Sequence, residues 1–351
     1  MRISDLEFFL VEVQRTGLLP PVRSLLVRLN SDNGAEGWGE GWISWRPSEL
    51  LPRRESILPV LSGRSIFDIE ELHSVEALAC PSLRAAVEMA CWDLAGKAFG
   101  QPLCRLWGGE YRQRIPLAVR LAGRWPQRLA WLARELSAHG YHAQVIAASG
   151  EVALDRQIVE TVRQSVGHGV QLRVDAQASY SLDDARDLCR EIESQQIQCL
   201  IDPLATRELY PIASLARQTT VPLGIWRAVL SPGDLLALTR CDAAAQVIID
   251  IEQLGGISPA RACAAIGAAA GISLMLGSRP SLGIATAAML HLAAAPPGLS
   301  AANESAYHQL ANDVLAEPLE VAGGMMTVPE GPGLGVEVDR GKVDRFLVDL
   351  F

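Results

Sequence analysis

The hydrophobic and polar positions of this chain follow two different periods, one near the N-terminus and one beyond it. Three segments rich in strand-forming residues come first, separated by turn-forming glycine, proline and asparagine: residues 8–13, 22–29 and 37–42. From Ser82 to Phe99 the apolar residues instead recur every three to four positions, and Gly100 ends the pattern. The first hundred residues therefore predict an antiparallel meander followed by an amphipathic helix.

The central part of the chain repeats a strand–helix unit at intervals of roughly 25 to 30 residues. Short apolar runs occupy residues 115–121, 143–147, 171–175, 199–201, 223–226, 246–251 and 272–276. Helical patterns lie between several of them, at residues 127–139, 154–166, 182–193 and 259–270. Seven or eight such units over about 200 residues indicate a parallel sheet closed into a barrel.

The expected fold class is therefore α/β, with a TIM-like (β/α) barrel and an α+β capping domain. We expect the capping domain over residues 1–114, the barrel over 115–318, and a C-terminal segment over 319–351 that returns to the capping domain. In barrels of this kind, the residues that do chemistry lie at the C-terminal ends of the strands.

Composition narrows the class of protein. The chain has 351 residues, 49% hydrophobic and 20% charged, which is enough to bury a large core. A formal net charge of −9 argues against nucleic-acid binding, which needs clustered cations. The seven cysteines show no metal-type spacing. The N-terminus lacks a signal-peptide pattern, and the alanine-rich stretch 262–270 is too short to cross a bilayer. We expect a cytoplasmic protein with no membrane segment.

Several motifs carry a resemblance to a known family. The longest covers Ala85–Gly109 and reads AAVEMACWDLAGKAFGQPLCRLWGG. Shorter motifs lie at residues 37–40, 172–177, 255–257, 277–284 and 332–336. In order and spacing, over nearly the whole chain, they resemble the mandelate racemase and muconate lactonizing enzyme branch of the enolase superfamily. The resemblance implies a capped barrel, in which a divalent metal held by three carboxylates stabilises an enediolate while lysine, or an Asp–His pair, moves a proton.

The resemblance places substitutions at the proton-moving and first metal positions. Val145 and Ala147 occupy the places of the two lysines on the second barrel strand. Asp175 matches the first metal carboxylate on the third strand, and Gln177 replaces the usual asparagine two residues later. Neither valine nor alanine can carry a proton, so the usual acid–base pair is missing from the second strand.

The fourth and fifth strands depart further from the family pattern. Ile201 falls where the second metal carboxylate belongs, with Asp202 one residue further on. Because side chains alternate along a strand, we expect Asp202 to point away unless a bulge re-aims it. Arg227 falls where the third carboxylate belongs. One carboxylate beside a guanidinium should not hold Mg²⁺ tightly, so no cofactor is expected, with Mg²⁺ as the alternative. Asp175 is then a vestigial metal ligand, joined by Asp202 only if the strand register is shifted.

Four further residues remain candidates for the site. Asp250, at the sixth strand, is a candidate base, although a strand-end aspartate more often caps the following loop. Arg279 and Glu304, near the seventh and eighth strand ends, are candidate ligand-binding residues together with Gln177 and Arg227. For Arg279 and Glu304 the alternative is an ordinary solvated loop residue.

Arg227 carries the sharpest hypothesis. We expect its guanidinium to take the electrostatic place of the metal and to pair with Asp175, with Asp250 as a further partner. The alternative is that Arg227 extends into solvent. Trp42 and Trp45, in the region of the family's capping loops, are expected either to line an apolar pocket or to pack at the domain interface.

Three functions follow from these positions. The first is an inactive homologue that keeps the barrel to bind a small acid. The second is a divergent, metal-independent enzyme that uses Asp250, Arg227 or Arg279 on a small acid. The third is a working Mg²⁺-dependent racemase, epimerase or lactonizing enzyme with ligands at shifted positions such as Asp202. The resemblance also implies a homo-oligomer.

Overall fold

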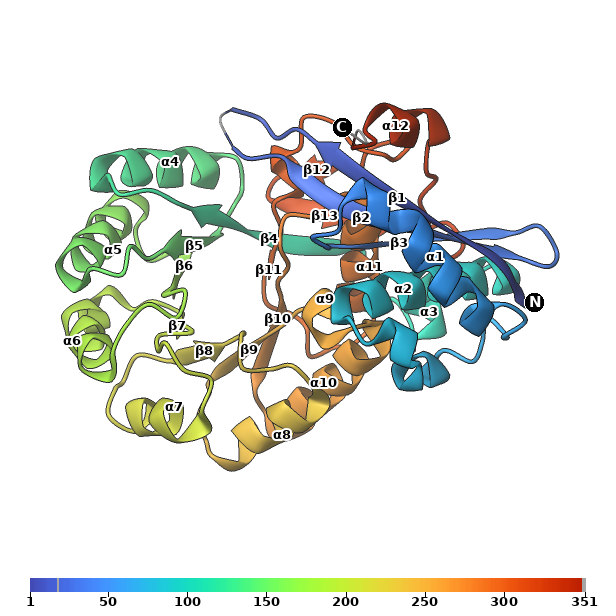
Figure 1. Ribbon diagram of the computed structural model, residues 1–351. Coiled ribbons are helices and arrows are strands. Elements are labelled where there is room, and N and C mark those ends of the chain that lie inside the picture. The colour runs from blue at the N-terminus through green and yellow to red at the C-terminus, as the bar shows by residue number, and fades with distance from the viewer. Residues whose placement is uncertain (18, 349–351) are drawn as a thin grey trace.

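In the computed structural model, which describes residues 1–17 and 19–348, a small antiparallel sheet lies beside a large barrel (Figure 1). The small sheet holds β1 (Ile3–Val13), β2 (Val22–Ser31) and β3 (Glu36–Gly41), paired in chain order. The meander predicted from the sequence is confirmed. Helix α2 (Pro81–Phe99) confirms the predicted helix, but its central turns are buried on all sides rather than on one face, and it packs against β3.

Glycines at every second position of β3 let this strand approach α2 closely. A Cβ atom on Gly39 would overlap the carbonyl group of Ala86 on the helix, and a Cβ atom on Gly37 or Gly41 would lie 2.3 or 2.4 Å from another backbone oxygen of α2. Because side chains alternate along a strand, these three glycines share the face that meets the helix. The two residues between them, Trp38 and Glu40, therefore point to the opposite face.

One helix of the capping domain was not predicted from the sequence. Helix α1 (Pro47–Leu61) contains Pro52 and Pro59, which read as helix breakers. It forms because Ile57 and Leu61 are buried in the capping core, beside the 3₁₀ segments η1 (Glu70–Ser74) and η2 (Glu76–Leu78). Tertiary packing here outweighs local propensity.

Eight parallel strands form the barrel. They are β4 (Arg114–Leu121), β5 (Ala143–Ala147), β6 (Gln171–Asp175), β7 (Cys199–Ile201), β8 (Leu223–Ile225), β9 (Gln246–Ile249), β10 (Ser273–Leu276) and β11 (Asn303–Glu304). The first seven pair in chain order, β11 pairs with β4, and the side chain of Asn303 accepts a hydrogen bond from Leu276 N at 2.7 Å. The barrel thus closes, as the repeat predicted.

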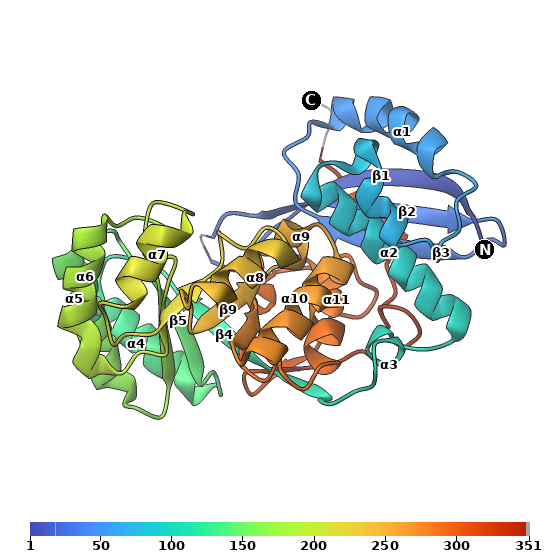
Figure 2. The same cartoon turned by 90° about the horizontal axis from the view of Figure 1, so that it is seen from below.

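Helices cover the outside of the barrel (Figure 2). The longer ones are α4 (Pro126–Ala138), α5 (Val152–Val166), α6 (Leu182–Ile192), α7 (Leu209–Ala216), α8 (Pro232–Arg240), α10 (Ile257–Ala270) and α11 (Gly283–Ala294). Shorter elements are α3 (Leu103–Leu106), α9 (Ile251–Leu254), η3 (Glu193–Gln195) and η4 (Tyr307–Gln309). No helix in residues 1–17 and 19–348 has the length and hydropathy needed to span a membrane.

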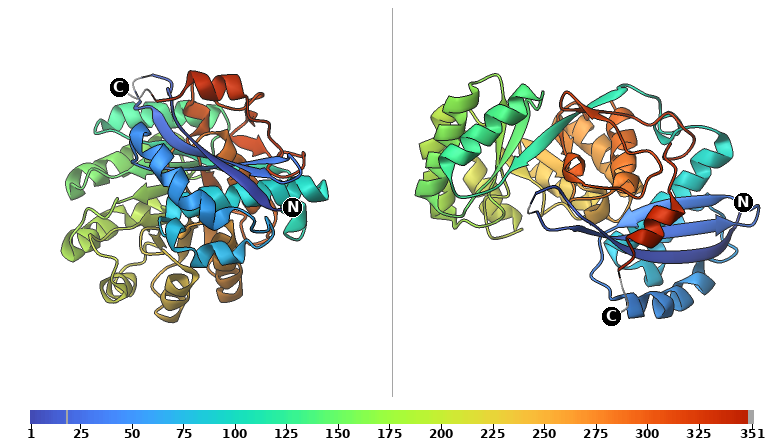
Figure 3. Two further views of the ribbon diagram at one scale, coloured as in Figure 1. Left: turned by 45° about the vertical axis from the view of Figure 1, so that its right-hand side comes forward. Right: turned by 90° about the horizontal axis from the view of Figure 1, so that it is seen from above.

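The C-terminal segment contacts both parts of the molecule. Strands β12 (Val321–Ala322) and β13 (Met325–Thr327) form a hairpin, and β13 pairs antiparallel with β4 at the barrel. Helix α12 (Arg340–Arg345) then lies against the capping sheet, where Leu347 bridges to Val11 (Figure 3). The domain boundaries predicted from the sequence stay a prediction, and residues 349–351 of that segment lie outside the described part of the chain.

Three buried carboxylates join the two domains: those of Glu40, Glu88 and Asp93. We call them the interface carboxylates. Glu88 accepts hydrogen bonds from Ser258 N and Oγ at 2.8 and 2.7 Å, at the start of α10. Asp93 accepts from the backbone of β3 and from Leu334 N at 3.0 and 2.9 Å, and pairs with a lysine of α2 at 2.7 Å. The long family-like motif of α2 therefore contributes to domain assembly.

Glu40 connects β3 to the start of α11. Its carboxylate accepts hydrogen bonds from Leu282 N and Ala285 N at 2.7 and 2.9 Å. These are backbone N–H groups at a helix N-terminus, which favour a carboxylate. Burial nevertheless raises the pKa of Glu40 to about 7, with the backbone hydrogen bonds from Ala285 and Leu282 opposing the rise.

Candidate functional site at the barrel mouth

Strand register places the predicted site residues at the C-terminal ends of the barrel strands. Asp175 pairs with Ala147 on β5 and with Ile201 on β7, and Ile201 pairs with Gly224 on β8. Val145 lies in the apolar cluster that fills the barrel interior. Val145 and Ala147, which the resemblance places at the two lysine positions of the family, both lie on β5, and this assignment stays a prediction.

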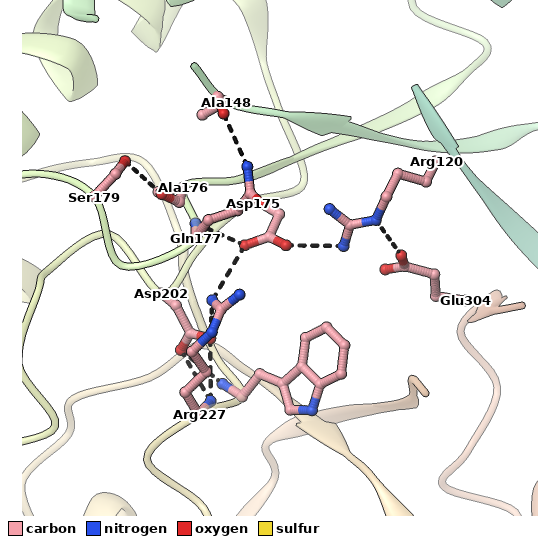
Figure 4. A network of polar contacts seen from close by, with 10 residues as sticks. Arg120, Ala148, Asp175, Ala176, Gln177, Ser179, Asp202, Arg227 and Glu304 are labelled. Carbon is pink, nitrogen blue, oxygen red and sulfur yellow. Dashed lines mark hydrogen bonds and ion pairs between the residues drawn. The ribbon is translucent and has the colours of Figure 1, made fainter. Parts of the chain in front are cut away.

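Asp175 is the centre of the polar network at the mouth (Figure 4). Its carboxylate is 1% exposed and lies 2.8 Å from Nη2 of Arg120 and 3.5 Å from Nη1 of Arg227. It also accepts a hydrogen bond from Gln177 N at 2.9 Å. The predicted pair between Arg227 and Asp175 is present, whereas Arg227 forms no ion pair with Asp250.

Arg120 was missed by the sequence analysis. It lies on β4, and its Nε donates to Glu304 Oε1 at 2.7 Å while Nη2 donates to Asp175. Burial disfavours its charge, but the charges of Glu304 and Asp175 outweigh that effect and raise its pKa. The sequence did contain an indication, because an arginine within an apolar strand needs a carboxylate partner.

The contact with Arg120 also defines the role of Glu304. Its side chain is 14% exposed and lies on β11 against Arg120. Glu304 is therefore part of the network rather than a solvated loop residue, while its role in ligand binding stays a prediction.

Asp202 adopts a left-handed backbone, with φ of 42°. Its Oδ1 accepts from Trp226 N at 2.9 Å, and its Oδ2 accepts from Arg227 N at 3.0 Å and from Arg227 Nη1 at 3.1 Å. Burial raises the pKa of Asp202, and the backbone hydrogen bonds from residues 226 and 227 oppose that rise. The sequence predicts that Asp202 points away unless the chain is locally re-aimed; its left-handed backbone is such a local change, and its carboxylate contacts Arg227.

Nη1 of Arg227 consequently bridges two carboxylates, those of Asp175 and Asp202, which come from adjacent strands. This arrangement answers whether the residues fit a divalent cation. Both carboxylates already face a guanidinium, and within residues 1–17 and 19–348 no three His, Cys, Asp or Glu side chains are grouped to hold a metal. The residues of the mouth do not fit a tightly bound Mg²⁺.

Gln177 is exposed and has a φ of 55°. Its side-chain nitrogen donates to Ala148 O at 2.9 Å, so it ties together the loops that follow β5 and β6. A role in ligand binding stays a prediction.

Asp250 caps a helix. Its Oδ1 accepts hydrogen bonds from Glu252 N and Gln253 N at 2.9 and 3.2 Å, at the start of α9. Burial raises the pKa of Asp250 to about 6, with the same backbone hydrogen bonds opposing the rise. Burial and the charge of Asp250 raise the pKa of Glu252 to about 7. The capping role that the sequence left open is present, and a catalytic role is untested.

Arg279 reaches the capping domain. Its guanidinium carbon lies 4.5 Å from the ring centroid of Trp42, a cation–π contact. Trp42 is 41% exposed, and its backbone N–H donates to Glu252. Trp45 is instead buried in the capping core against Phe8. Of the two tryptophans, Trp42 meets the barrel, whereas Trp45 stabilises its own domain.

Comparison with known proteins matches both parts of the chain. Residues 128–342, more than half of the chain, match the domain described as "Enolase C-terminal domain-like". Residues 20–108 match the "Mandelate racemase / muconate lactonizing enzyme, N-terminal domain". The chain belongs to the mandelate racemase and muconate lactonizing enzyme branch of the enolase superfamily. This superfamily branch contains racemases, epimerases and cycloisomerases.

Individual relatives of this superfamily member align over nearly their full length. An N-succinylamino acid racemase of Thermus thermophilus is 31% identical over 343 residues, which cover 92% of this chain and 89% of that protein. A solved isomerase of Streptomyces coelicolor is 30% identical, with a TM-score of 0.88 and coverage of 98% and 96%. A dipeptide epimerase of Enterococcus faecalis, solved with Mg and a dipeptide, shares the fold at 23% identity, with a TM-score of 0.89 and coverage of 96% and 100%.

Proposed function

We propose that this enolase-superfamily member binds a small carboxylate at the barrel mouth without Mg²⁺, and does not use the family's metal and lysine chemistry. The observation that carries the proposal is the convergence of Arg120 and Arg227 on Asp175, the residue that matches the family's first metal carboxylate. In relatives that use a metal, the cation supplies positive charge at this place. Here two guanidinium groups supply it.

Both arginines keep donors for a ligand. Nη1 of Arg120 and Nε and Nη2 of Arg227 make no hydrogen bond with the described residues. The two side chains are 29% and 35% exposed. Guanidinium groups bind carboxylates through paired N–H donors, so a ligand carboxylate has partners at the mouth.

The charge balance of the mouth sets the strength of binding. Three acids, Asp175, Asp202 and Glu304, already face the two arginines. A ligand therefore adds a negative charge to a site that already holds one more carboxylate than guanidinium groups, so only weak binding is expected. Two or three charge-assisted hydrogen bonds, less the cost of association, support a dissociation constant of about 1 mM for a minimal carboxylate.

The absence of lysine from β5 supports the second half of the proposal, that the protein does not use the family's lysine chemistry. Val145 and Ala147 have no proton to exchange, and Val145 is fully buried within the barrel interior. A racemase needs a base on the path of the α-proton and a second group to return it. The β5 positions that would hold both lysines in this family offer neither.

Calorimetry tests the proposal directly. Acetate titrated into the wild-type protein should give saturable heat, and MgCl₂ should give none. Arg120→Met and Arg227→Met should each weaken acetate binding about tenfold, the equivalent of one charge-assisted hydrogen bond. Arg190→Met is the matched control, because Arg190 is 75% exposed on α6, away from the mouth. Acetate binding that survives in both mouth variants would overturn the proposal.

One observation favours a second function, a metal-independent enzyme with Asp250 as base. The pKa of Asp250 is raised to about 6 by burial, which suits proton transfer near neutral pH. Incubation of a panel of 2-substituted carboxylic acids with the enzyme in D₂O, followed by NMR, should then show α-deuterium. Asp250→Asn keeps an oxygen to cap α9 and should abolish that exchange. Absence of deuterium in every acid would remove this candidate.

A further inference from the structure

A cavity of about 180 Å³ lies beside Arg227, away from the barrel axis. The loops that follow β6, β7 and β8 surround it together with α7, so it opens on the same side of the barrel as the mouth. Ile225 marks its inner wall and belongs to the core between strands and helices, whereas Trp226, the next residue, packs against the barrel interior. The cavity thus lies outside the barrel wall.

The lining of this cavity, which we call the side cavity, is divided by polarity. Its apolar part includes Leu204, Ile212 and Ile225, which are 4%, 3% and 1% exposed. Its polar part comprises Arg227, the exposed Arg207, Thr206 and Asp202, whose carboxylate is already paired with Arg227. An apolar cavity of about 150 Å³ holds a benzene molecule, so the side cavity has the size of one aromatic ring or branched alkyl group.

The side cavity is held by backbone contacts between its loops. Ala178 N donates to Asp202 O at 2.8 Å, and Tyr180 N donates to Pro203 O at 3.2 Å. Of the five non-glycine residues with positive φ in residues 1–17 and 19–348, three lie here: Gln177, Ala178 and Asp202. Such conformations persist where surrounding contacts enforce them, and they concentrate at ligand sites. The cavity is therefore preformed.

Arg227 connects the side cavity with the mouth. Its Nη1 contacts Asp175 and Asp202, and the same residue forms part of the cavity wall. A carboxylate bound to Arg227 has the apolar wall within reach of its own side group. The divided lining fits a molecule with one anionic end and one apolar end.

We propose that the side cavity is the specificity subsite of this protein, and that it takes the apolar side group of a monocarboxylate whose carboxylate binds Arg227. The inference rests on the proposed carboxylate-binding function and names its ligand class. The preferred ligand carries an aromatic or branched aliphatic group of about six carbons next to the carboxylate.

The test compares acetate with phenylacetate by calorimetry on the full-length protein. Phenylacetate should bind the wild type at least about tenfold more tightly, because its ring leaves water for the side cavity. Ala228→Leu places three more carbon atoms in the cavity lining and should reduce the phenylacetate-to-acetate affinity ratio to about one. Ala138→Leu, on the exposed face of α4, is the matched control and should keep the wild-type ratio.

A second variant tests the same prediction in case Ala228→Leu does not fold. Ile212→Val opens the cavity by one methyl group and should shift preference from phenylacetate towards 4-methylphenylacetate, by about threefold. Equal binding of acetate and phenylacetate by the wild type would overturn the subsite and leave the proposed function intact. Binding of neither acid would overturn the proposed function. A phenylacetate preference unaffected by Ala228→Leu in a folded protein would place the subsite elsewhere and overturn this inference.

Discussion

Buried carboxylates serve different purposes at the domain interface and at the barrel mouth. The interface carboxylates mostly accept backbone N–H groups, as Glu40 does at α11 and Asp93 does at Leu334. At the mouth, Asp175 and Glu304 instead face the guanidinium of Arg120. Backbone donors are fixed by the fold, whereas arginine side chains keep further N–H groups for a ligand.

This difference separates what the family motifs preserve from what they do not. The longest motif supplies Glu88 and Asp93, and the motif at residues 37–40 supplies Glu40. These residues assemble the capped barrel. The proposed function instead concerns Val145, Ala147 and Arg227, which the resemblance places at positions that would hold a metal or move a proton, and a shared fold does not by itself fix the chemistry at such positions.

Replacing Asp93 with alanine should have the largest effect on stability. The change leaves two buried backbone N–H groups without an acceptor and one lysine without its partner, so we expect a loss of about 4 kcal/mol in the free energy of unfolding. Urea denaturation measures the loss. Asp183→Ala is the control, because Asp183 is 87% exposed and should change stability by less than about 0.5 kcal/mol. A similar loss in both variants would contradict the role assigned to Asp93.

Gly39→Ala should be the next most damaging change. The added Cβ overlaps the carbonyl of Ala86 on α2, and a backbone atom cannot move aside easily. We expect a loss of about 3 kcal/mol, measured by urea denaturation. Gly169→Ala meets no atom within 4 Å and serves as the matched control, with an expected change near zero or slightly stabilising. Full stability of Gly39→Ala would show that β3 and α2 are not tightly packed.

Arg120→Met should destabilise less, because Arg120 is 29% exposed and Arg227 still faces Asp175. We expect a loss of about 2 kcal/mol in urea, since Asp175 and Glu304 lose their shared partner. The double variant Arg120→Met, Asp175→Leu should recover part of that loss, because it removes the unpaired buried charge as well. The single variant Asp175→Leu completes the comparison, and a double-variant loss equal to the sum of the two single-variant losses would argue against coupling between these residues.

Glu252→Gln should give the smallest effect, which is a change in how the free energy of unfolding depends on pH. The pKa of Glu252 is about 7 in the folded protein and about 4.5 without the fold, so between these values the native state holds a proton that the unfolded chain has lost. Its contribution to stability therefore falls as pH rises from about 4.5 to 7. The variant should exceed the wild type by about 1 kcal/mol at pH 8 and match it at pH 4.

Urea denaturation at the two pH values measures this shift. Glu208→Gln, at an exposed position before α7, is the control and should follow the wild-type pH curve. Parallel curves for Glu252→Gln and the wild type would show that Glu252 titrates normally.

Most of the barrel was predictable because its strands are short, buried and apolar. The predicted runs 143–147 and 171–175 coincide with β5 and β6, since both faces of these strands are covered and the pattern is continuous. Helix α1 was not predictable, because Pro52 and Pro59 oppose it locally and only packing against the capping core offsets them.

The mouth was predictable in part. The resemblance placed Asp175, Ile201 and Arg227 together, and in the structure Asp175 pairs with Ile201 while Arg227, beyond the end of β8, contacts Asp175. Arg120 was missed because it lies inside an apolar run, and its partners come from strands distant in the sequence. The position of Asp202 depends on a left-handed φ of 42°, which alternation along a strand does not predict.

The central claim is that a guanidinium, and not a metal ion, lies between Asp175 and Asp202. Anomalous diffraction from a crystal soaked in Mn²⁺, which prefers the same oxygen ligands as Mg²⁺, tests it most directly. We predict no anomalous peak between the two carboxylates, with Arg227 Nη1 in contact with both. A manganese peak about 2 Å from oxygens of Asp175 and Asp202, with Arg227 displaced, would contradict the account.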